Sequence, residues 1–203
     1  MNETHINGSL ILASQSPRRK YLLEQAGLVF SVAVSRVSEA DFPWTDPVNY
    51  TRDLARAKAE EVAGRFPESW VIGADTIVMA GEELLEKPES RDDARRMLTR
   101  LSGTVHQVFT GFSVVHRNKA HIHAQTIRSD VRFKPLSISE IEWYVHTDEP
   151  YDKAGAYAIQ GLGSSLVQAV NGSYTNVVGL PVCEVIDYLL RHDVLRRVVG
   201  AER

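Results

Sequence analysis

The sequence predicts an α/β fold, in which helices flank a mixed β-sheet and a cleft lies between two lobes. Strand-like and helix-like segments alternate over the first half of the chain, and a hairpin of two long strands precedes further helices and strands. Alternation is typical of parallel strands joined by helices, whereas a hairpin is antiparallel, so the sheet should be mixed. The 203 residues contain no repeat, linker or low-complexity segment, and we expect one domain over residues 1–203.

The first half of the chain has well-marked element ends. We expect strands at residues 10–13, 30–34 and 70–79, and helices at 17–27, 47–64 and 90–101. A polar residue followed by proline starts two of these helices, at Ser16-Pro17 and Asp46-Pro47, and Gly27 ends the first. Ser90 and Asp93 have the spacing of a capping box at the start of the third.

The second half begins with the hairpin. Its strands are expected at 105–116 and 121–133, with Asn118 in the turn. Ser137 and Glu140 form a second capping box, for a helix that ends near His146. Residues 155–178 are rich in glycine and predict short strands with a tight turn at Asn171-Gly172, and Pro181 starts the last helix.

The composition restricts the class of protein. The net charge is −3, which argues against a general nucleic-acid-binding surface. Cys183 is the one cysteine, so no disulfide can form within the chain, as is typical of a reducing compartment. The N-terminus is polar and lacks the pattern of a secretory signal, and no apolar run is long enough to span a bilayer. We expect a cytoplasmic protein with no membrane partner.

The segment from Leu10 to Lys20 predicts an anion-binding site. A short apolar strand ends in Ser14 and Ser16, and a helix start with Arg18, Arg19 and Lys20 follows. The N–H groups and dipole of a helix N-terminus favour an anion, and guanidinium groups match phosphate oxygens. The alternative is an ordinary capped helix with a solvated basic first turn, although cations there oppose the helix dipole.

Asp75 is a carboxylate inside an apolar strand. Burial of an unpaired carboxylate is unfavourable, so Asp75 needs a partner cation, a metal ion or a raised pKa. Gly73 and Ala74 are small and leave room for a ligand to approach. The alternative is a structural aspartate that caps a neighbouring loop.

Two lysines are further candidates. Lys58 shares a helix face with Leu54 and Val62, so its ammonium either extends to water or reaches into a site, and the helix alone favours water. Lys87 follows the strand of Asp75 and its turn, and the chain could bring it back near Asp75. Taken alone it is an ordinary loop lysine.

A glycine-rich segment, residues 149–163, is the last candidate. Its glycines permit close approach of the backbone to a ligand, and Asp152, Lys153 and Gln160 could supply polar contacts. The alternative is a structural turn with a surface ion pair between Asp152 and Lys153.

The residues favour a hard cation over zinc or a covalent nucleophile. His121 and His123 share a strand face without an obvious third ligand, whereas Asp75 and Glu39 suit magnesium or manganese. We expect Cys183 in a core helix, and the sequence has no Gly-x-Ser-x-Gly motif. The sequence therefore predicts neither a cysteine nor a serine nucleophile.

Seven blocks of the chain, in order, resemble the Maf family of nucleoside triphosphate pyrophosphatases, from Leu10 to about Leu190. The blocks are Leu12–Arg19, Ala55–Ala59, Gly73–Thr76, Glu86–Pro88, Leu101–Gly103, Asp152–Tyr157 and Asn176–Pro181. The resemblance implies hydrolysis of a nucleoside triphosphate to the monophosphate and pyrophosphate with magnesium, manganese or cobalt. It also implies an elongated mixed sheet around a deep cleft, an architecture similar to the inosine triphosphate pyrophosphatases, and a homodimer.

The resemblance also assigns roles to individual residues. Asp75 matches the catalytic carboxylate, which is usually described as the proton acceptor. Glu39 matches another active-site position, and we expect Glu39 and Asp75 to hold the cation. The other matched active-site positions are Lys58, Lys87, Ser14, Arg18, Arg19, Thr76 and Gln160. Arg18, Thr76 and Gln160 resemble the subtype acting on dTTP and UTP, whereas the subtype acting on 7-methyl-GTP tends to carry Trp, Gln and Glu there. Ala158 departs from the glycine of many relatives, and its methyl group would narrow the pocket.

These matches predict a mechanism. Water activated by the bound metal would attack the α-phosphorus, pyrophosphate would leave, and Asp75 would take the proton of the water. Arg18, Arg19, Lys58 and Lys87 would neutralise the triphosphate and the leaving pyrophosphate. Thr76 and Gln160 read the pyrimidine edge. Two alternatives stay open: a non-catalytic nucleotide-binding regulator of septum formation and cell division, and a pyrophosphatase that removes modified nucleotides.

Overall fold

In a computed structural model that describes residues 3–198, the chain divides into two compact units. The first unit comprises residues up to 75, 111–126 and from 179; the second comprises 76–110 and 127–178. Residues 1–2 and 199–203 lie outside the described residues. The predicted single domain includes them, and the prediction that the N-terminus is no secretory signal rests partly on residues 1–2. Within residues 3–198, no helix is both long and apolar enough to cross a membrane.

The main sheet is mixed, as predicted. Its strand order is β3-β2-β4-β6-β7-β8, and β5 pairs with β4. The pairing of β2 with β3 and β4 is parallel, whereas β5 and β8 pair antiparallel with β4 and β7. The strands are β2 (Ser9–Leu12), β3 (Ser31–Val32), β4 (Ser69–Ala80), β5 (Glu83–Leu85), β6 (Val105–His116), β7 (His121–Phe133) and β8 (Val167–Asn171).

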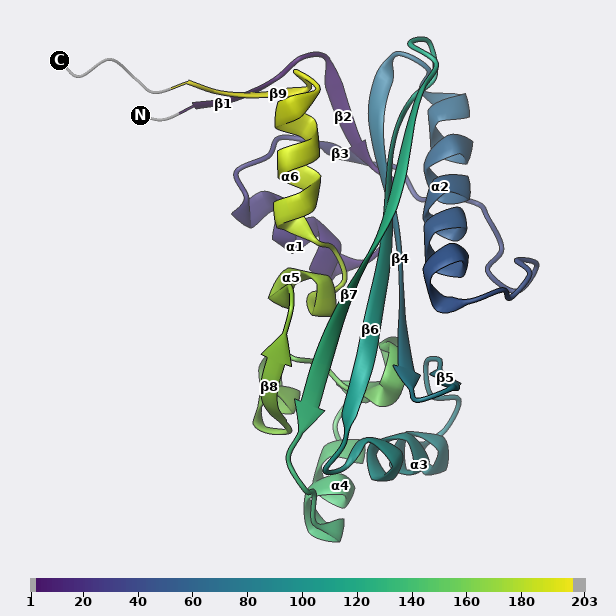
Figure 1. Cartoon of the computed structure of the whole chain (residues 1–203), viewed down its shortest axis with the longest axis vertical. Helices are drawn as coiled ribbons and strands as arrows, with labels where there is room; N and C mark the ends of the chain where they lie inside the picture. The colour runs from purple at the N-terminus through teal and green to yellow at the C-terminus, as the bar shows by residue number, and fades with distance from the viewer. Residues whose placement is uncertain (1–2, 199–203) are drawn as a thin grey trace, which may run out of the picture. The chain divides into compact units, whose positions relative to one another are not determined.

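Helices flank this sheet in each unit. The first unit contains α1 (Pro17–Gln25), α2 (Pro47–Arg65) and α6 (Val182–Arg191), with α2 on one face of the sheet and α6 on the other (Figure 1). The second contains α3 (Arg91–Leu101), α4 (Ile138–Val145), α5 (Tyr174–Val178) and three 3₁₀ turns, η1 (Pro150–Asp152), η2 (Ala154–Ala156) and η3 (Gly161–Ser165). The first unit also has a two-stranded antiparallel sheet, β1 (Glu3–Ile6) with β9 (Leu195–Val198).

Most predicted element ends are confirmed. The side chains of Ser16, Asp46, Ser90 and Ser137 accept hydrogen bonds at the starts of their helices, and Ser137 with Glu140 completes a capping box. Asp93 differs, because its carboxylate accepts from the backbone N–H of Glu89, so the box at Ser90 is half formed.

Two predictions are wrong, and a third is confirmed only in part. The strand expected at 30–34 is present as β3 but spans two residues, and β1 and β9 were not predicted. Residues 155–178 hold 3₁₀ turns, one strand and a short helix in place of several short strands, because Gly155 and Gly161 have φ values of 73° and 65°, which a strand does not allow. Cys183 is exposed on α6 and does not lie in the core.

Helix α2 lies against the sheet because two strand glycines admit it. A β-carbon at Gly73 would lie 2.4 Å from the carbonyl oxygen of Ala55, and one at Gly111 would lie 2.1 Å from that of Thr51. Ala59 packs in the same layer, in a buried cluster with Ile11, Ala13, Val62, Ala63, Val71 and Val115. Glycine at both strand positions therefore sets the distance between helix and sheet.

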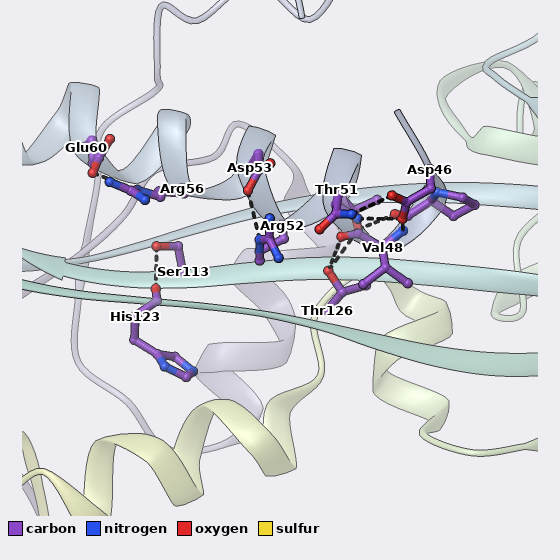
Figure 2. A network of polar contacts seen from close by, with 12 residues as sticks. Asp46, Val48, Thr51, Arg52, Asp53, Arg56, Glu60, Ser113, His123 and Thr126 are labelled. Carbon is purple, nitrogen blue, oxygen red and sulfur yellow. Dashed lines mark hydrogen bonds and ion pairs between the residues drawn. The ribbon is translucent and has the colours of Figure 1, made fainter. Parts of the chain in front are cut away.

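Polar contacts fix the start of α2 on β7 (Figure 2). The Asp46 carboxylate accepts from two backbone N–H groups of the first turn. The hydroxyl oxygens of Thr51 and Thr126 lie 3.1 Å apart, and Thr126 donates to the carbonyl of Val48 at 2.8 Å. These bonds hold the helix in register along the strand, which matters for Lys58 further along it.

Candidate active site

A buried ion-pair cluster lies between α2 and β4 in the first unit. The Lys58 ammonium donates to Asp75 and to Glu39, each at 2.7 Å. The side chains of Lys58 and Asp75 are about nine-tenths buried, whereas that of Glu39 is 57% exposed. Lys58 is thus the partner cation that the burial of Asp75 requires, and its ammonium does not extend to water.

The backbone explains why these two charges meet. Successive side chains of a strand point to opposite faces, so Val71, Gly73 and Asp75 share the face that α2 covers. Gly73 contacts the helix at Ala55 and Ala59, which places the intervening Lys58 one step along the strand, at Asp75. The room that we expected Gly73 to leave for a ligand is filled by α2, and this corrects the prediction.

Arg19 joins three segments beside Asp75. Its Nε donates to the carbonyl of Gly179 at 2.8 Å, and its Nη1 donates to the carbonyl of Ala74 at 2.9 Å and to the Ser14 hydroxyl at 3.2 Å. Ser14 also accepts from the backbone N–H of Ser16. The predicted anion-binding segment is therefore held to β4 and to Gly179, which lies between α5 and α6, by one guanidinium.

The charges in this cluster act on one another. Burial lowers the pKa of Arg19; the carboxylate of Asp75 opposes this shift, Arg18 adds to it, and Glu39 opposes it. Arg18, Arg19 and Lys58 are thus grouped with two carboxylates, which leaves an excess of one positive charge. Such an arrangement suits a polyanionic ligand.

Glu39 and Asp75 are the side chains that could hold a metal ion. Each carboxylate has an oxygen 2.7 Å from the Lys58 ammonium, which lies between them, so the two side chains are close to each other. No group of three His, Cys, Asp or Glu side chains able to hold a metal occurs within residues 3–198. A magnesium-like ion commonly uses one or two carboxylates and completes its shell with phosphate oxygens and water, so the pair fits such an ion.

The remaining predicted residues belong to the second unit. The Thr76 and Thr110 hydroxyl oxygens lie 3.0 Å apart, and Thr110 donates to the carbonyl of Asn176 at 2.9 Å. A hydroxyl has one proton, and that of Thr110 goes to Asn176, so the Thr110 oxygen accepts in its contact with Thr76. Lys87 is exposed, and Gln160 is half-buried before η3.

Lys87 and the glycine-rich segment are held close together within this unit. The backbone N–H of Gly155 donates to the carbonyl of Glu86 at 3.0 Å, and the position has φ of 73° with Val78 at 3.1 Å from a β-carbon built there. The Lys153 ammonium bonds the carbonyl of Glu149 and the carboxylate of Asp152. The Lys153 ammonium is thus held within this segment by both groups.

Two residues near Gln160 were not recognised from the sequence. Tyr144 and Glu149 bind the backbone on both sides of it. The paired glycines at 161 and 163 were the signal that something approaches the chain closely at this place.

The fold and this charged cluster define an α/β protein with a buried carboxylate–ammonium pair beside an arginine-bearing helix start. The sequence matches the family described as Maf-like protein over residues 9–192, and the chain belongs to the Maf family.

Curated relatives are similar over nearly the whole chain. A protein of Citrifermentans bemidjiense named dTTP/UTP pyrophosphatase is 47% identical over 195 residues, which cover 96% of this chain and 97% of that protein. One of Syntrophus aciditrophicus with the same name is 46% identical, over 89% of this chain and 88% of the relative. The Ham1 protein of Staphylococcus aureus has a TM-score of 0.43 at 14% identity, covering 78% of this chain and 79% of that one. A similarity as weak as this last one carries no argument.

Proposed function

We propose that this protein hydrolyses dTTP and UTP to the nucleoside monophosphate and pyrophosphate. The observation that carries the proposal is the buried Asp75–Lys58 pair with the more exposed Glu39 beside it. The chain that holds this cluster is 46–48% identical to proteins named dTTP/UTP pyrophosphatase. A carboxylate inside the protein with a fixed ammonium beside it is costly to maintain by packing alone, and sites that move protons commonly contain such groups.

Asp75 is the proposed proton acceptor for the attacking water. Its position on a central strand and its bond to Lys58 fix its direction, and general bases of this kind contribute about 10²–10⁴-fold to rate. Lys58, Arg18, Arg19 and Lys87 are proposed to neutralise the triphosphate and the charge on the leaving pyrophosphate. Because Arg19 also bonds Ala74 and Gly179, it additionally holds the segment of Ser14 and Arg18 in place.

A divalent cation is part of the proposal. Glu39 and Asp75 would hold magnesium, manganese or cobalt, and the ion would supply Lewis acidity and a lower pKa for bound water. Activity should disappear with EDTA and return with excess manganese or magnesium; full activity in EDTA would exclude this part of the proposal.

The base is proposed to be read by Thr76 and Gln160, with Arg18 as the third marker of the subtype. Uracil and thymine present an N3–H donor, whereas cytosine presents an acceptor at N3. The hydroxyl oxygen of Thr76 or the amide oxygen of Gln160 would accept from the N3–H of uracil or thymine, and neither can accept from N3 of cytosine. Mismatched hydrogen-bonding groups discriminate strongly, so this polarity favours dTTP and UTP over CTP.

The test is release of pyrophosphate from dTTP, UTP, CTP and 7-methyl-GTP by the wild type, Asp75→Asn and Asp53→Asn. Asp53 is a matched control, because it lies on exposed surface of α2 beside Arg52. We expect Asp75→Asn to lose about 10²-fold or more of kcat and Asp53→Asn to keep wild-type activity. Nucleotide binding without turnover by the wild type would instead favour the regulator of septum formation.

A homodimer in the cytoplasm is also proposed, on the resemblance to the family. Sedimentation at micromolar concentration tests the homodimer, and a monomer at all concentrations would contradict it. Fractionation of cells tests the location in the cytoplasm.

A further inference from the structure

The segment that carries Gln160 is bound on both sides by one tyrosine–glutamate pair. Tyr144, on α4, accepts from the backbone N–H of Ala158 at 3.1 Å and donates its own proton to the Glu149 carboxylate at 2.8 Å. Glu149 in turn accepts from the backbone N–H groups of Leu162 and Gly163, at 3.0 and 2.8 Å. Gln160 lies midway between these attachment points.

Glycine is required for this close approach. A β-carbon at Gly161 would lie 2.4 Å from the Glu149 carboxylate, and this glycine has a φ of 65°. A β-carbon at Gly163 would lie 2.6 Å from the Tyr144 hydroxyl and 2.3 Å from the carbonyl of Ala158. Because Gly161 and Gly163 lack a β-carbon, Tyr144 and Glu149 can approach the backbone that follows Gln160.

The pair is fixed at its own end as well. The Tyr144 ring is fully buried in the core of the second unit, with Leu98, Phe133 and Leu166 in the same cluster. Burial, and then the Glu149 carboxylate, raise the pKa of Tyr144. Burial opposes ionisation of Glu149, but hydrogen bonds from Gly163, Tyr144 and Leu162 outweigh it and lower the pKa of that carboxyl. The Tyr144 hydroxyl therefore stays protonated and donates its hydrogen bond to the Glu149 carboxylate.

We propose that Tyr144 and Glu149 are positioning residues that set the place of Gln160 and thereby the choice of pyrimidine base. This inference rests on the proposed function, in which Gln160 reads the base. The pair touches the backbone on either side of Gln160 and leaves its side chain to the nucleotide. Loss of the pair should weaken base discrimination and leave the chemistry at Asp75 intact.

The experiment uses Tyr144→Phe in the full chain, which removes both hydrogen bonds of the hydroxyl and keeps the buried ring. Tyr157→Phe is the matched control, because Tyr157 is buried in the same cluster and its hydroxyl bonds His106 at 2.7 Å. We expect Tyr144→Phe to lower the ratio of kcat/KM for UTP over CTP about tenfold, through KM rather than kcat, and Tyr157→Phe to keep the ratio. Glu149→Gln should act as Tyr144→Phe does, and it serves if the latter does not fold.

A double-variant cycle separates positioning from general loosening. If Tyr144 acts through Gln160, then Gln160→Ala with Tyr144→Phe discriminates no worse than Gln160→Ala alone. The inference would be overturned if the double variant lowered the ratio of kcat/KM for UTP over CTP by the product of the two separate effects. A wild-type ratio in Tyr144→Phe would also overturn it.

Amide hydrogen exchange gives a readout without substrate. Residues 158, 162 and 163 should exchange faster in Tyr144→Phe and as in wild type in Tyr157→Phe. If the wild type cleaves neither dTTP nor UTP, the proposed function fails on that result alone. Unchanged exchange at these amides overturns the positioning role whatever the activity.

Discussion

The substitution Gly73→Ala tests how the ion-pair cluster is built. The added β-carbon would lie 2.4 Å from the carbonyl oxygen of Ala55 and 2.8 and 2.9 Å from the nitrogen and β-carbon of Ala59. Ordinary contact begins near 3.4 Å, and the obstructing atoms belong to the helix itself, so α2 must retreat by about 1 Å. Overpacking of this kind lowers the free energy of unfolding by about 1–3 kcal/mol.

The same movement should reach the chemistry. Lys58 lies between Ala55 and Ala59 on α2, and its ammonium is 2.7 Å from Asp75. A retreat of about 1 Å takes that distance beyond the usual hydrogen-bond range. Misplacement on this scale reduces turnover by about 10²-fold in well-positioned sites.

Gly64→Ala is the matched control on the same helix. A β-carbon there meets only the end of the Arg117 side chain, at 3.5 Å. Alanine is the better helix former by about 0.5–1 kcal/mol, so this variant should be as stable as wild type or more so, with full activity. Urea unfolding followed by circular dichroism, with pyrophosphate release, measures both effects. The reasoning fails if Gly73→Ala matches wild type, or if the two variants lose stability alike.

Three further predictions concern pH, Arg19 and Thr76. Burial lowers the pKa of His106 to about 4, so the folded protein binds this proton less readily than the unfolded chain. The part of the free energy of unfolding that depends on this proton, about 3 kcal/mol, is fully present above the ordinary histidine pKa of about 6.5 and is lost as pH falls from there toward 4. The free energy of unfolding in urea should therefore decrease less on acidification in His106→Gln than in the wild type. Equal pH dependence of the two proteins would contradict this. Arg19→Lys replaces the two guanidinium nitrogens that reach Gly179, Ala74 and Ser14 with one, so it should lose about 1–3 kcal/mol of unfolding free energy in the same assay. An unchanged midpoint would contradict the bridging role of Arg19. Thr76→Val should narrow the kcat/KM preference for UTP over CTP about tenfold, and a wild-type preference would remove Thr76 from base reading.

The sequence indicated that Asp75 needs a partner but not which one. An aspartate in an apolar strand signals an unbalanced charge from composition alone. Its partner depends on how α2 meets β4, and that contact is decided by Gly73 against Ala55 and Ala59, residues 14–18 positions away. The small size of Gly73 predicts space for a ligand, because the helix that fills this space is not visible in a local sequence pattern.

In the glycine-rich segment, residues 149–163, the sequence predicted a close approach but not which groups approach. Its glycines predicted close approach, which is correct, but the approaching groups are the hydroxyl of Tyr144 and the carboxylate of Glu149. The prediction of short strands failed there because Gly155 and Gly161 adopt positive φ. Helix starts were predicted well, since Ser16, Asp46 and Ser137 act through neighbours two or three residues away.

Hydrolysis of UTP in ¹⁸O-labelled water tests the central claim most directly. The proposed attack of water on the α-phosphorus, with Asp75 as proton acceptor, places the label in UMP and none in pyrophosphate. Mass spectrometry of the two products should find labelled UMP and unlabelled pyrophosphate for the wild type, and neither product at a comparable rate for Asp75→Asn. Label in pyrophosphate, or release of orthophosphate and UDP, would contradict the account.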